Sequence, residues 1–143
     1  MLMDKANTDL HDKDNCTPLC LAIRQENFEA ALTLIQGGAN VNLGGGIFGS
    51  PMHLAIVRLK ISLISALIDK KADLNKQDSD GNTPCHLVMN IFSKNPEKCS
   101  HILELIAFNG ASLNQKNNDF WAPLHTAVRK GQEKAVKAIL RVN

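Results

Sequence analysis

The sequence predicts an all-α solenoid, a stack of helix-turn-helix units in which each unit packs against the next. Four short segments share one pattern: TPLCLAI from Thr17, SPMHLAI from Ser50, TPCHLVM from Thr83 and APLHTAV from Ala122, at intervals of 33, 33 and 39 residues. A second pattern, seen as GGANVN, KKADLN and NGASLN, follows each of the first three segments. Two patterns repeated in the same phase indicate structural repeats, and units of this length bury a continuous core only by stacking.

Each unit is expected to begin with a short helix. In three of the four segments a hydroxyl side chain precedes a proline. A hydroxyl can cap free backbone N–H groups, and proline suits the first helical position. In the first unit this helix is expected from Pro18 to about Gln25. Ala122 stands in place of the hydroxyl residue in the fourth unit, so that cap is expected to be lost.

A second helix is expected to follow in each unit, because apolar residues recur there at helical spacing, as at Ile64, Leu67 and Ile68. We expect Leu67 to be buried between stacked units. A glycine such as Gly38 or Gly110 then ends the helix, since glycine adopts the left-handed closing conformation at little cost. A turn of seven residues, such as KQDSDGN, leads to the next unit.

The longer third interval places six extra residues between the two helices of the third unit, in NIFSKNPEKCSH. Asn95 fits a helix cap there, and Pro96 fits the first helical position. Insertions in repeat stacks fall in loops on one edge. We expect a tolerated loop on the edge away from the connecting turns, with a secondary contact site as the alternative.

These patterns resemble the ankyrin repeat, whose period is 33 residues and whose mark is T-P-L-H-x-A. The resemblance covers nearly the whole chain and is closest at DSDGNTPCHLV, GGANVN and KKADLN. It implies L-shaped units, in which two antiparallel helices stack and the connecting turns project as β-hairpin fingers. We expect one domain over residues 1–143, with a partial finger at about 1–16 and units at about 17–49, 50–82, 83–121 and 122–143. We also expect the chain to be a segment of a longer ankyrin-repeat protein.

Two of the four fingers depart from the family pattern at one position. The family prefers glycine there, as at Gly81, but Phe48 and Phe120 occupy the position in the second and fourth fingers. Asn15 occupies it in the first, and asparagine tolerates positive φ better than most residues. Either the two aromatic fingers adopt a different turn, or they accept strain to expose an apolar side chain. We expect Phe120 to fold back on the base of its hairpin.

The glycine-rich stretch GGGIFGSP raises the alternative of a small-ligand site. Gly44 and Gly49 have the separation of a phosphate-binding loop, but Ser50 stands where that loop needs lysine and Pro51 where it needs a hydroxyl. By its place in the repeat the stretch is the second finger, and its glycines serve tight turning. We therefore expect no cofactor, with the small-ligand site as the less favoured reading.

The remaining composition favours a non-catalytic intracellular protein. Four scattered cysteines lack C-x-x-C spacing, which is typical of reduced thiols in the cytoplasm or nucleus. His53, His86 and His125 share one position of the repeat, where the resemblance implies a ring bonded to nearby backbone, so neither a metal site nor an enzyme is expected. The net charge of +2 predicts no nucleic-acid partner, and no apolar run is long enough to insert into a membrane. The expected state is a monomer.

The resemblance implies a protein–protein interaction module, because fingers and first helices of such repeats line a concave face that binds other proteins. The alternative is a purely structural segment of a longer array whose binding site lies elsewhere. From position within the repeat, the expected partner-binding residues are Ile47, Phe48, Arg58, Asp80, Asn82, Ile91, Trp121, Arg129 and Lys130.

The expected partner is a protein with an acidic segment and apolar anchors. Cations recur near the end of the first helix in three units, at Arg24, at Arg58 and at Arg129 with Lys130, which predicts a basic row on the concave side. Ile47 and Trp121 at finger tips predict apolar anchors, although Trp121 has the alternative of folding back on its hairpin. Scattered solvated charges are the alternative to the row.

Asn75 lies in a stretch, LIDKKADLN, that resembles the segment in which ankyrin repeats can be hydroxylated on asparagine. The alternative is that this asparagine closes its loop by bonding to backbone.

Overall fold

A computed structural model describes residues 6–44 and 46–142 of the chain. These residues confirm the all-α solenoid. They form four helical pairs: α1 (Pro18–Arg24) with α2 (Phe28–Gln36), α3 (Pro51–Val57) with α4 (Ile61–Asp69), α5 (Pro84–Ile91) with α6 (Pro96–Phe108), and α7 (Pro123–Arg129) with α8 (Glu133–Val142). Two 3₁₀ helices, η1 (Gly46–Phe48) and η2 (Phe92–Lys94), complete the described elements.

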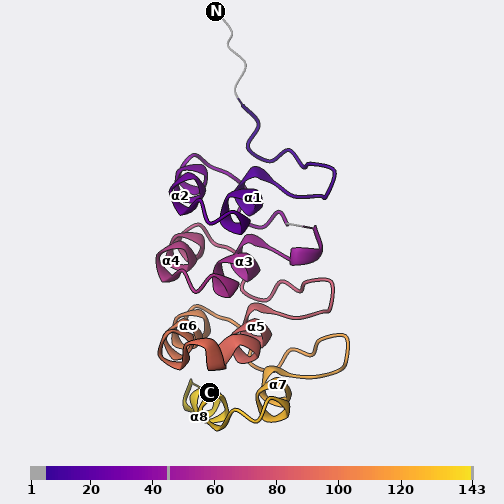
Figure 1. The fold of residues 1–143 in the computed structure, drawn as a ribbon, viewed down its shortest axis with the longest axis vertical. Coiled ribbons are helices and arrows are strands. Elements are labelled where there is room, and N and C mark those ends of the chain that lie inside the picture. The colour runs from indigo at the N-terminus through magenta and orange to yellow at the C-terminus, as the bar shows by residue number, and fades with distance from the viewer. Residues whose placement is uncertain (1–5, 45, 143) are drawn as a thin grey trace, which may run out of the picture.

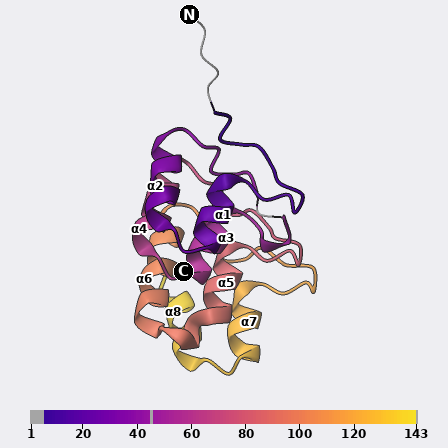
Figure 2. The same ribbon diagram turned by 45° about the horizontal axis from the view of Figure 1, so that its top comes forward.

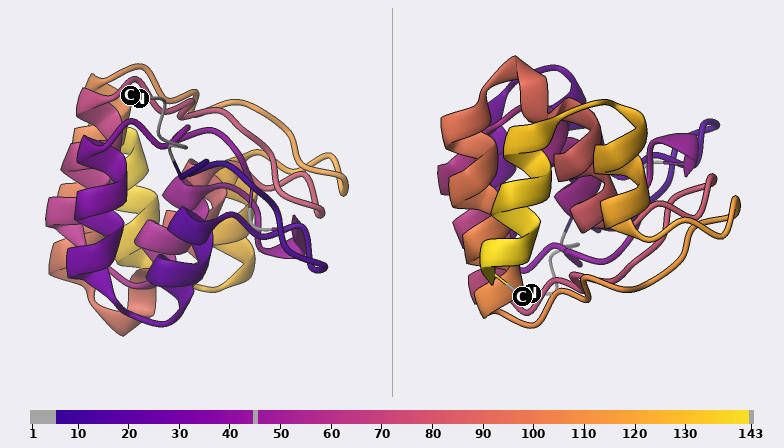
Figure 3. Two further views of the ribbon diagram at one scale, coloured as in Figure 1. Left: turned by 90° about the horizontal axis from the view of Figure 1, so that it is seen from above. Right: turned by 90° about the horizontal axis from the view of Figure 1, so that it is seen from below.

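The helices stand in two columns. α1, α3, α5 and α7 form one column, α2, α4, α6 and α8 form the other, and the connecting turns project from the side of the first column (Figures 1 and 2). Within the first column each helix packs against the next, while α2 packs on α4 and α6 on α8. Seen along the stack, the turns extend away from both columns and give each layer an L shape (Figure 3).

The first helices begin at caps that the sequence predicts. The side chains of Thr17, Ser50 and Thr83 accept hydrogen bonds from backbone N–H groups in the first turns of α1, α3 and α5. The Ala122 side chain has no hydrogen-bond acceptor, so α7 begins without a side-chain cap. Its own N–H still donates to Nδ1 of His125 at 3.1 Å, so half of the reciprocal cap remains.

The core runs without interruption through the stack and contains buried residues from all eight α-helices. Leu67 is fully buried, as expected, and so are Met52 and Met89 in successive first-column helices. Helices of seven to nine residues are too short to be stable alone in water. The apolar contacts between pairs therefore carry most of the stability of the fold.

The six-residue insertion is helical, and the expectation of a loop there is wrong. The chain leaves α5 directly into η2, and α6 then has 13 residues, against 9 in α4. Phe92 and Cys99 from this region are buried in the core, and the Cys99 thiol donates to the carbonyl oxygen of Ile91 at 3.7 Å. The added residues thus enlarge the core instead of looping out of it.

Histidine and asparagine side chains tie consecutive pairs together along the finger side. Nε2 of His53 bonds the carbonyl oxygen of Asn82 at 2.8 Å, and Nε2 of His86 bonds that of Trp121 at 2.7 Å. Oδ1 of Asn75 accepts from the N–H of Ser112 at 2.6 Å, which confirms that this asparagine bonds to backbone. Each such bond satisfies a backbone group that has no helical partner.

The turns between pairs, here called fingers one to four, comprise residues 10–16, 43–49, 76–82 and 115–121. Fingers one, three and four are hydrogen-bonded turns, and the described residues contain no β-strand, so the expected hairpins are reduced to their turns. In each of the three, one acidic or amide side chain accepts two backbone N–H bonds of about 3 Å. The acceptors are Asp12, Asp78 and Asn117.

Both alternatives for the aromatic fingers occur, one in each. Finger four keeps the common turn and places Phe120 at φ 62°, in the left-handed region, with a side chain 77% exposed. Phe120 therefore does not fold back, contrary to expectation. Finger two has Gly45 where the other fingers have the acceptor side chain. It forms η1 instead, which includes Phe48 as its last residue.

We predict that Leu67→Ala lowers the free energy of unfolding by about 2–5 kcal/mol, because truncation leaves a cavity between stacked pairs. Urea unfolding followed by circular dichroism measures the change. A variant within about 0.5 kcal/mol of the parent would contradict the placement of Leu67 in the core.

We predict different effects on stability for two glycine substitutions in the fingers. Phe120→Gly relieves a left-handed conformation that costs about 1–2 kcal/mol and loses little packing, so it should leave stability unchanged or raise it by up to about 1 kcal/mol. Phe48→Gly relieves no such strain and should lower stability. Equal losses from both substitutions, measured by urea unfolding, would show that Phe120 is not strained.

Candidate functional site

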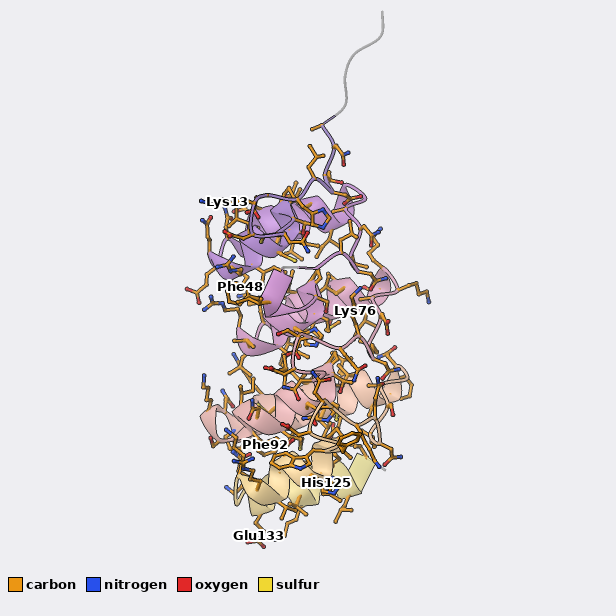
Figure 4. All side chains as sticks on the ribbon, turned by 90° about the vertical axis from the view of Figure 1, so that its right-hand side faces the viewer. Lys13, Phe48, Lys76, Phe92, His125 and Glu133 are labelled. Carbon is orange, nitrogen blue, oxygen red and sulfur yellow. The ribbon has the colours of Figure 1, made fainter. Side chains whose placement is uncertain are left out.

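The surface that fingers and first helices share, here called the inner surface, holds most of the exposed apolar side chains. Lys13 and Phe48 of fingers one and two lie along the same edge of the stack as Phe92, just beyond α5, whereas Lys76 lies along the other edge (Figure 4). The fingers project from the side of the stack formed by the first helices (Figure 1). The large apolar side chains exposed on the fingers and first helices are Leu10, Leu21, Ile47, Phe48, Val57, Phe120 and Val128, although Val128 occupies the position at which Met89 of α5 is buried.

Two adjoining hollows mark the inner surface at pairs one and two. The first, here called the Phe48 hollow, has a volume of about 460 Å³ and is lined by Leu21, Arg24, Gln25, Phe48, Leu54, Val57 and Arg58. The second lies beside fingers one and two and is lined by Lys13, Asp14, Asn15, Arg24, Gly46, Ile47 and Phe48. Arg24 and Phe48 line both hollows, so these two side chains form the wall between them.

Arg24 is held in place by stacking. Its guanidinium carbon lies 4.0 Å from the centre of the Phe48 ring, a close cation–π contact. Among the described residues, the one side-chain hydrogen bond of Arg24 is a long contact from Nη1 to the Cys16 sulfur, at 3.9 Å. The guanidinium is therefore fixed in position while much of its donor capacity stays uncommitted within residues 6–44 and 46–142.

Arg58 joins pair two to pair one. Its Nη2 donates to the carbonyl oxygen of Arg24 at 2.7 Å, at the carboxyl end of α1, where a cation also complements the helix dipole. Nη1 lies 3.6 Å from Oε1 of Glu26, and both side chains are solvent-exposed enough for this pair to contribute little stability. The expected binding residue Arg58 thus has a structural role and still lines the Phe48 hollow.

A third hollow lies at pair four. It has a volume of about 630 Å³ and is lined by Leu113, Asn114, Trp121, Ala122, Leu124, His125, Val128 and Arg129. The Arg129 guanidinium stacks on the half-buried Trp121 ring at 4.7 Å. Lys130, the next residue, is exposed. Trp121 is therefore held against its own helix pair and keeps one part open to solvent.

The middle of the inner surface differs from expectation at Ile91. This side chain is 9% exposed and belongs to the core, at the point where α5 runs directly into η2. Asn82 is committed within the protein, since its Oδ1 accepts from Nδ2 of Asn117 at 2.9 Å. Asp80 is exposed, and its backbone N–H and carbonyl are bonded to Asp78 and Asn118, but no hydrogen bond of its carboxylate is found among the described residues. The expected basic row is interrupted here, where Asn90 is the exposed residue.

Sequence reasoning missed the pairing of arginines with finger aromatics. Arg24 and Arg129 occupy equivalent positions at the ends of α1 and α7, and each stacks on an aromatic side chain of a finger. The recurrence of arginine at one repeat position is visible in the sequence. The partner aromatics lie at different repeat positions, Phe48 after the helix and Trp121 before it, so no spacing rule identifies them.

The glycines of finger two have structural reasons. A Cβ on Gly46 would collide with the carbonyl oxygen of Asp14, and one on Gly49 would lie 2.8 Å from the His53 ring. Both glycines have positive φ. The finger therefore packs closely against its neighbours, and a backbone carbonyl at this place is a poor neighbour for a phosphate group.

Burial controls the titration of the thiols and of two histidines. Desolvation raises the pKa of Cys20 and Cys99 to about 11 and that of Cys85 to about 12, so these thiols stay protonated and unreactive. Desolvation also lowers the pKa of His53 and His86, against the opposing effect of their bonds to backbone carbonyls. The described residues contain no group of three or more His, Cys, Asp or Glu side chains placed to hold a metal ion. Within the same ranges, no helix is long and apolar enough to cross a membrane.

Comparison with known proteins gives one consistent result. Residues 14–45 match the ankyrin repeat family. The B-cell lymphoma 3 protein of Homo sapiens is 28% identical over 90% of this chain and 29% of its own length. The human transient receptor potential cation channel subfamily A member 1 is 27% identical over 98% of this chain and 13% of its own length. Ankyrin repeat domain-containing protein 13C of Mus musculus is 33% identical over 73% and 19%. The chain thus spans less than a third of each of these relatives.

We predict that the protein loses stability as the pH falls through about 6.5, the pKa of histidine in an unfolded chain. Because the pKa values of His53 and His86 are lowered in the folded state, the unfolded chain takes up protons first. The contribution is therefore complete above the unfolded pKa and is lost below it. Urea unfolding at about pH 7.5, 6.5 and 5.5, above the range of carboxylate titration, measures the slope.

Replacing both histidines with asparagine should flatten this slope, whatever it does to absolute stability. A parent protein whose stability stays constant or rises over the same range would show that the two rings are not buried in their neutral form.

Proposed function

We propose that this chain, which belongs to the ankyrin repeat family, is a non-catalytic module that binds a partner protein along its inner surface. Proteins of this family generally serve as interaction modules, and the coarse function follows from that membership. The finer statement, that the partner lies on the fingers and the first helices, is our proposal. The four cysteines of the chain are free and buried, which suits a reducing intracellular compartment.

One observation carries this proposal: apolar and cationic side chains are exposed together on the inner surface. Ile47 is 74% exposed at the tip of finger two, beside the stacked pair of Arg24 and Phe48. Leu21 and Val57 are exposed on the neighbouring first helices. Large apolar side chains and arginine are the usual anchors of protein interfaces. An apolar patch rimmed by charge is typical of a contact surface.

The alternative, a structural segment of a longer array, is favoured by a different surface. Val128 is 63% exposed on α7, and His125 is exposed as well. At the equivalent positions of α5, Met89 and His86 are almost fully buried against the following pair. This face of α7 therefore has the composition of a stacking surface, and a further helical pair would cover it.

We predict that Trp121→Ala weakens partner binding by at least about tenfold, the effect of removing one interface anchor. Ile47→Ser should act in the same direction with a smaller effect. The tagged chain is used to capture proteins from a cell lysate, and the affinity of each captured protein is then measured for parent and variants. Phe108→Ser is the matched control, because Phe108 is equally apolar and 89% exposed but lies at the end of α6, away from the fingers.

Circular dichroism and urea unfolding confirm that each variant is folded. If Phe108→Ser weakens binding as much as the finger variants, the inner surface is not the binding face. If the chain captures no protein at all, the structural alternative holds.

A further inference from the structure

We infer that the Phe48 hollow binds an acidic side chain of a partner peptide together with an adjacent aliphatic residue. The inference rests on the proposed function and specifies the chemistry that the partner must present at this end of the inner surface. It depends on three features of the hollow: the cation that is fixed there, the balance of charge in its lining, and the apolar walls.

The fixed cation is Arg24. Stacking on the Phe48 ring at 4.0 Å covers one face of the guanidinium and leaves its N–H donors pointing along the edges of the plane. A carboxylate fits two of these donors side by side, and such bidentate pairs are among the stronger hydrogen bonds in proteins. Because the ring already orients the guanidinium, little rotamer freedom remains to be lost when a carboxylate binds.

The lining of the hollow contains more positive than negative charge. Arg24 and Arg58 both contribute to it, and no acidic side chain does. Glu26 is the acid closest to Arg58, at 3.6 Å, but it lies outside the lining and is exposed. One N–H of the Arg58 guanidinium donates to the Arg24 carbonyl oxygen, and the group has other N–H donors that could bond an anion. An anion in the hollow would therefore meet two guanidinium groups and no carboxylate within the lining itself.

The walls of the hollow specify a peptide and not a small inorganic anion. Leu21 and Val57 are 39% and 42% exposed, on the adjacent pairs one and two, and Leu54 also lines the hollow. A free phosphate leaves these side chains in water. A glutamate or aspartate followed by leucine, isoleucine or valine covers them, and burying one aliphatic side chain contributes about 1.5–3 kcal/mol when complete.

Pair four provides an internal comparison. Arg129 stacks on Trp121 as Arg24 stacks on Phe48, so the two ends share a cation held by an aromatic ring. The hollow at pair four contains only this one cation, and most of its lining is apolar. The second guanidinium, from Arg58, is what distinguishes the Phe48 hollow as a carboxylate site.

The test uses blocked peptides and nuclear magnetic resonance of the whole chain. The probe is acetyl-Gly-Glu-Leu-Leu-Gly-amide, and its analogue with glutamine in place of glutamate is the control. We expect the glutamate peptide to shift the methyl signals of Leu21 and Val57 and the side-chain signal of Arg24. We expect the glutamine peptide to bind at least about tenfold more weakly. Equal binding of the two peptides, or no shift at these residues, would overturn the inference.

Matched variants locate the site. Arg24→Gln should weaken the glutamate peptide about tenfold, and Arg129→Gln should leave its affinity within about twofold. Arg24→Lys keeps the charge but loses the planar donor pair, so it should fall between Arg24→Gln and the parent. A lysine variant that binds as well as the parent would overturn the bidentate geometry. The dispersion of the spectra shows that each variant is folded.

A third peptide, acetyl-Gly-Leu-Leu with a free carboxyl terminus, distinguishes the source of the carboxylate. Weaker binding than the glutamate peptide supports an acidic side chain, whereas tighter binding would overturn it in favour of a chain end. If proteins are captured through Trp121 while the peptides fail at the Phe48 hollow, only this inference falls. If capture also fails, the proposed function falls with it.

Discussion

The whole structure depends on one constraint: a pair of helices of seven to nine residues cannot bury enough apolar surface to stand alone. Each pair must therefore pack against its neighbour, and the apolar contacts between neighbouring pairs form the core. The same need explains the polar side chains between pairs. His53, His86 and Asn75 each cross to the next pair and bond a backbone group there, which adds to the hydrogen bonds within the fingers.

The candidate site follows from a single local difference between fingers. Three fingers close around a side-chain acceptor, but finger two has Gly45 at that position and turns through η1. That turn carries Phe48 to Arg24, and the pair then separates two hollows on the inner surface. A missing hydrogen-bond acceptor thus leads, through an altered turn, to a cation fixed in a partly apolar setting.

The sequence predicts the stack and its local rules well, because repeated patterns, caps and helical spacing act over a few residues. The caps at Thr17, Ser50 and Thr83 and the burial of Leu67 follow from those rules. The burial of Ile91, the helical insertion and the exposure of Phe120 do not. Each depends on what another segment covers or leaves open, and the stacking of Arg24 on Phe48 joins residues of different pairs. Position within a repeat identifies a surface residue only where neighbouring repeats have standard lengths.

The buried thiols have a practical consequence. Cys20 lies in pair one, and Cys85 and Cys99 lie in pair three, all fully buried and protonated at neutral pH. An alkylating reagent reaches such a thiol only after its surroundings open. In a chain of units that contact only their neighbours, opening free energies differ along the array. The labelling rate of each natural cysteine therefore reports how often the helical pair around it opens. Comparing these rates under native conditions would show which end of the array unfolds locally first.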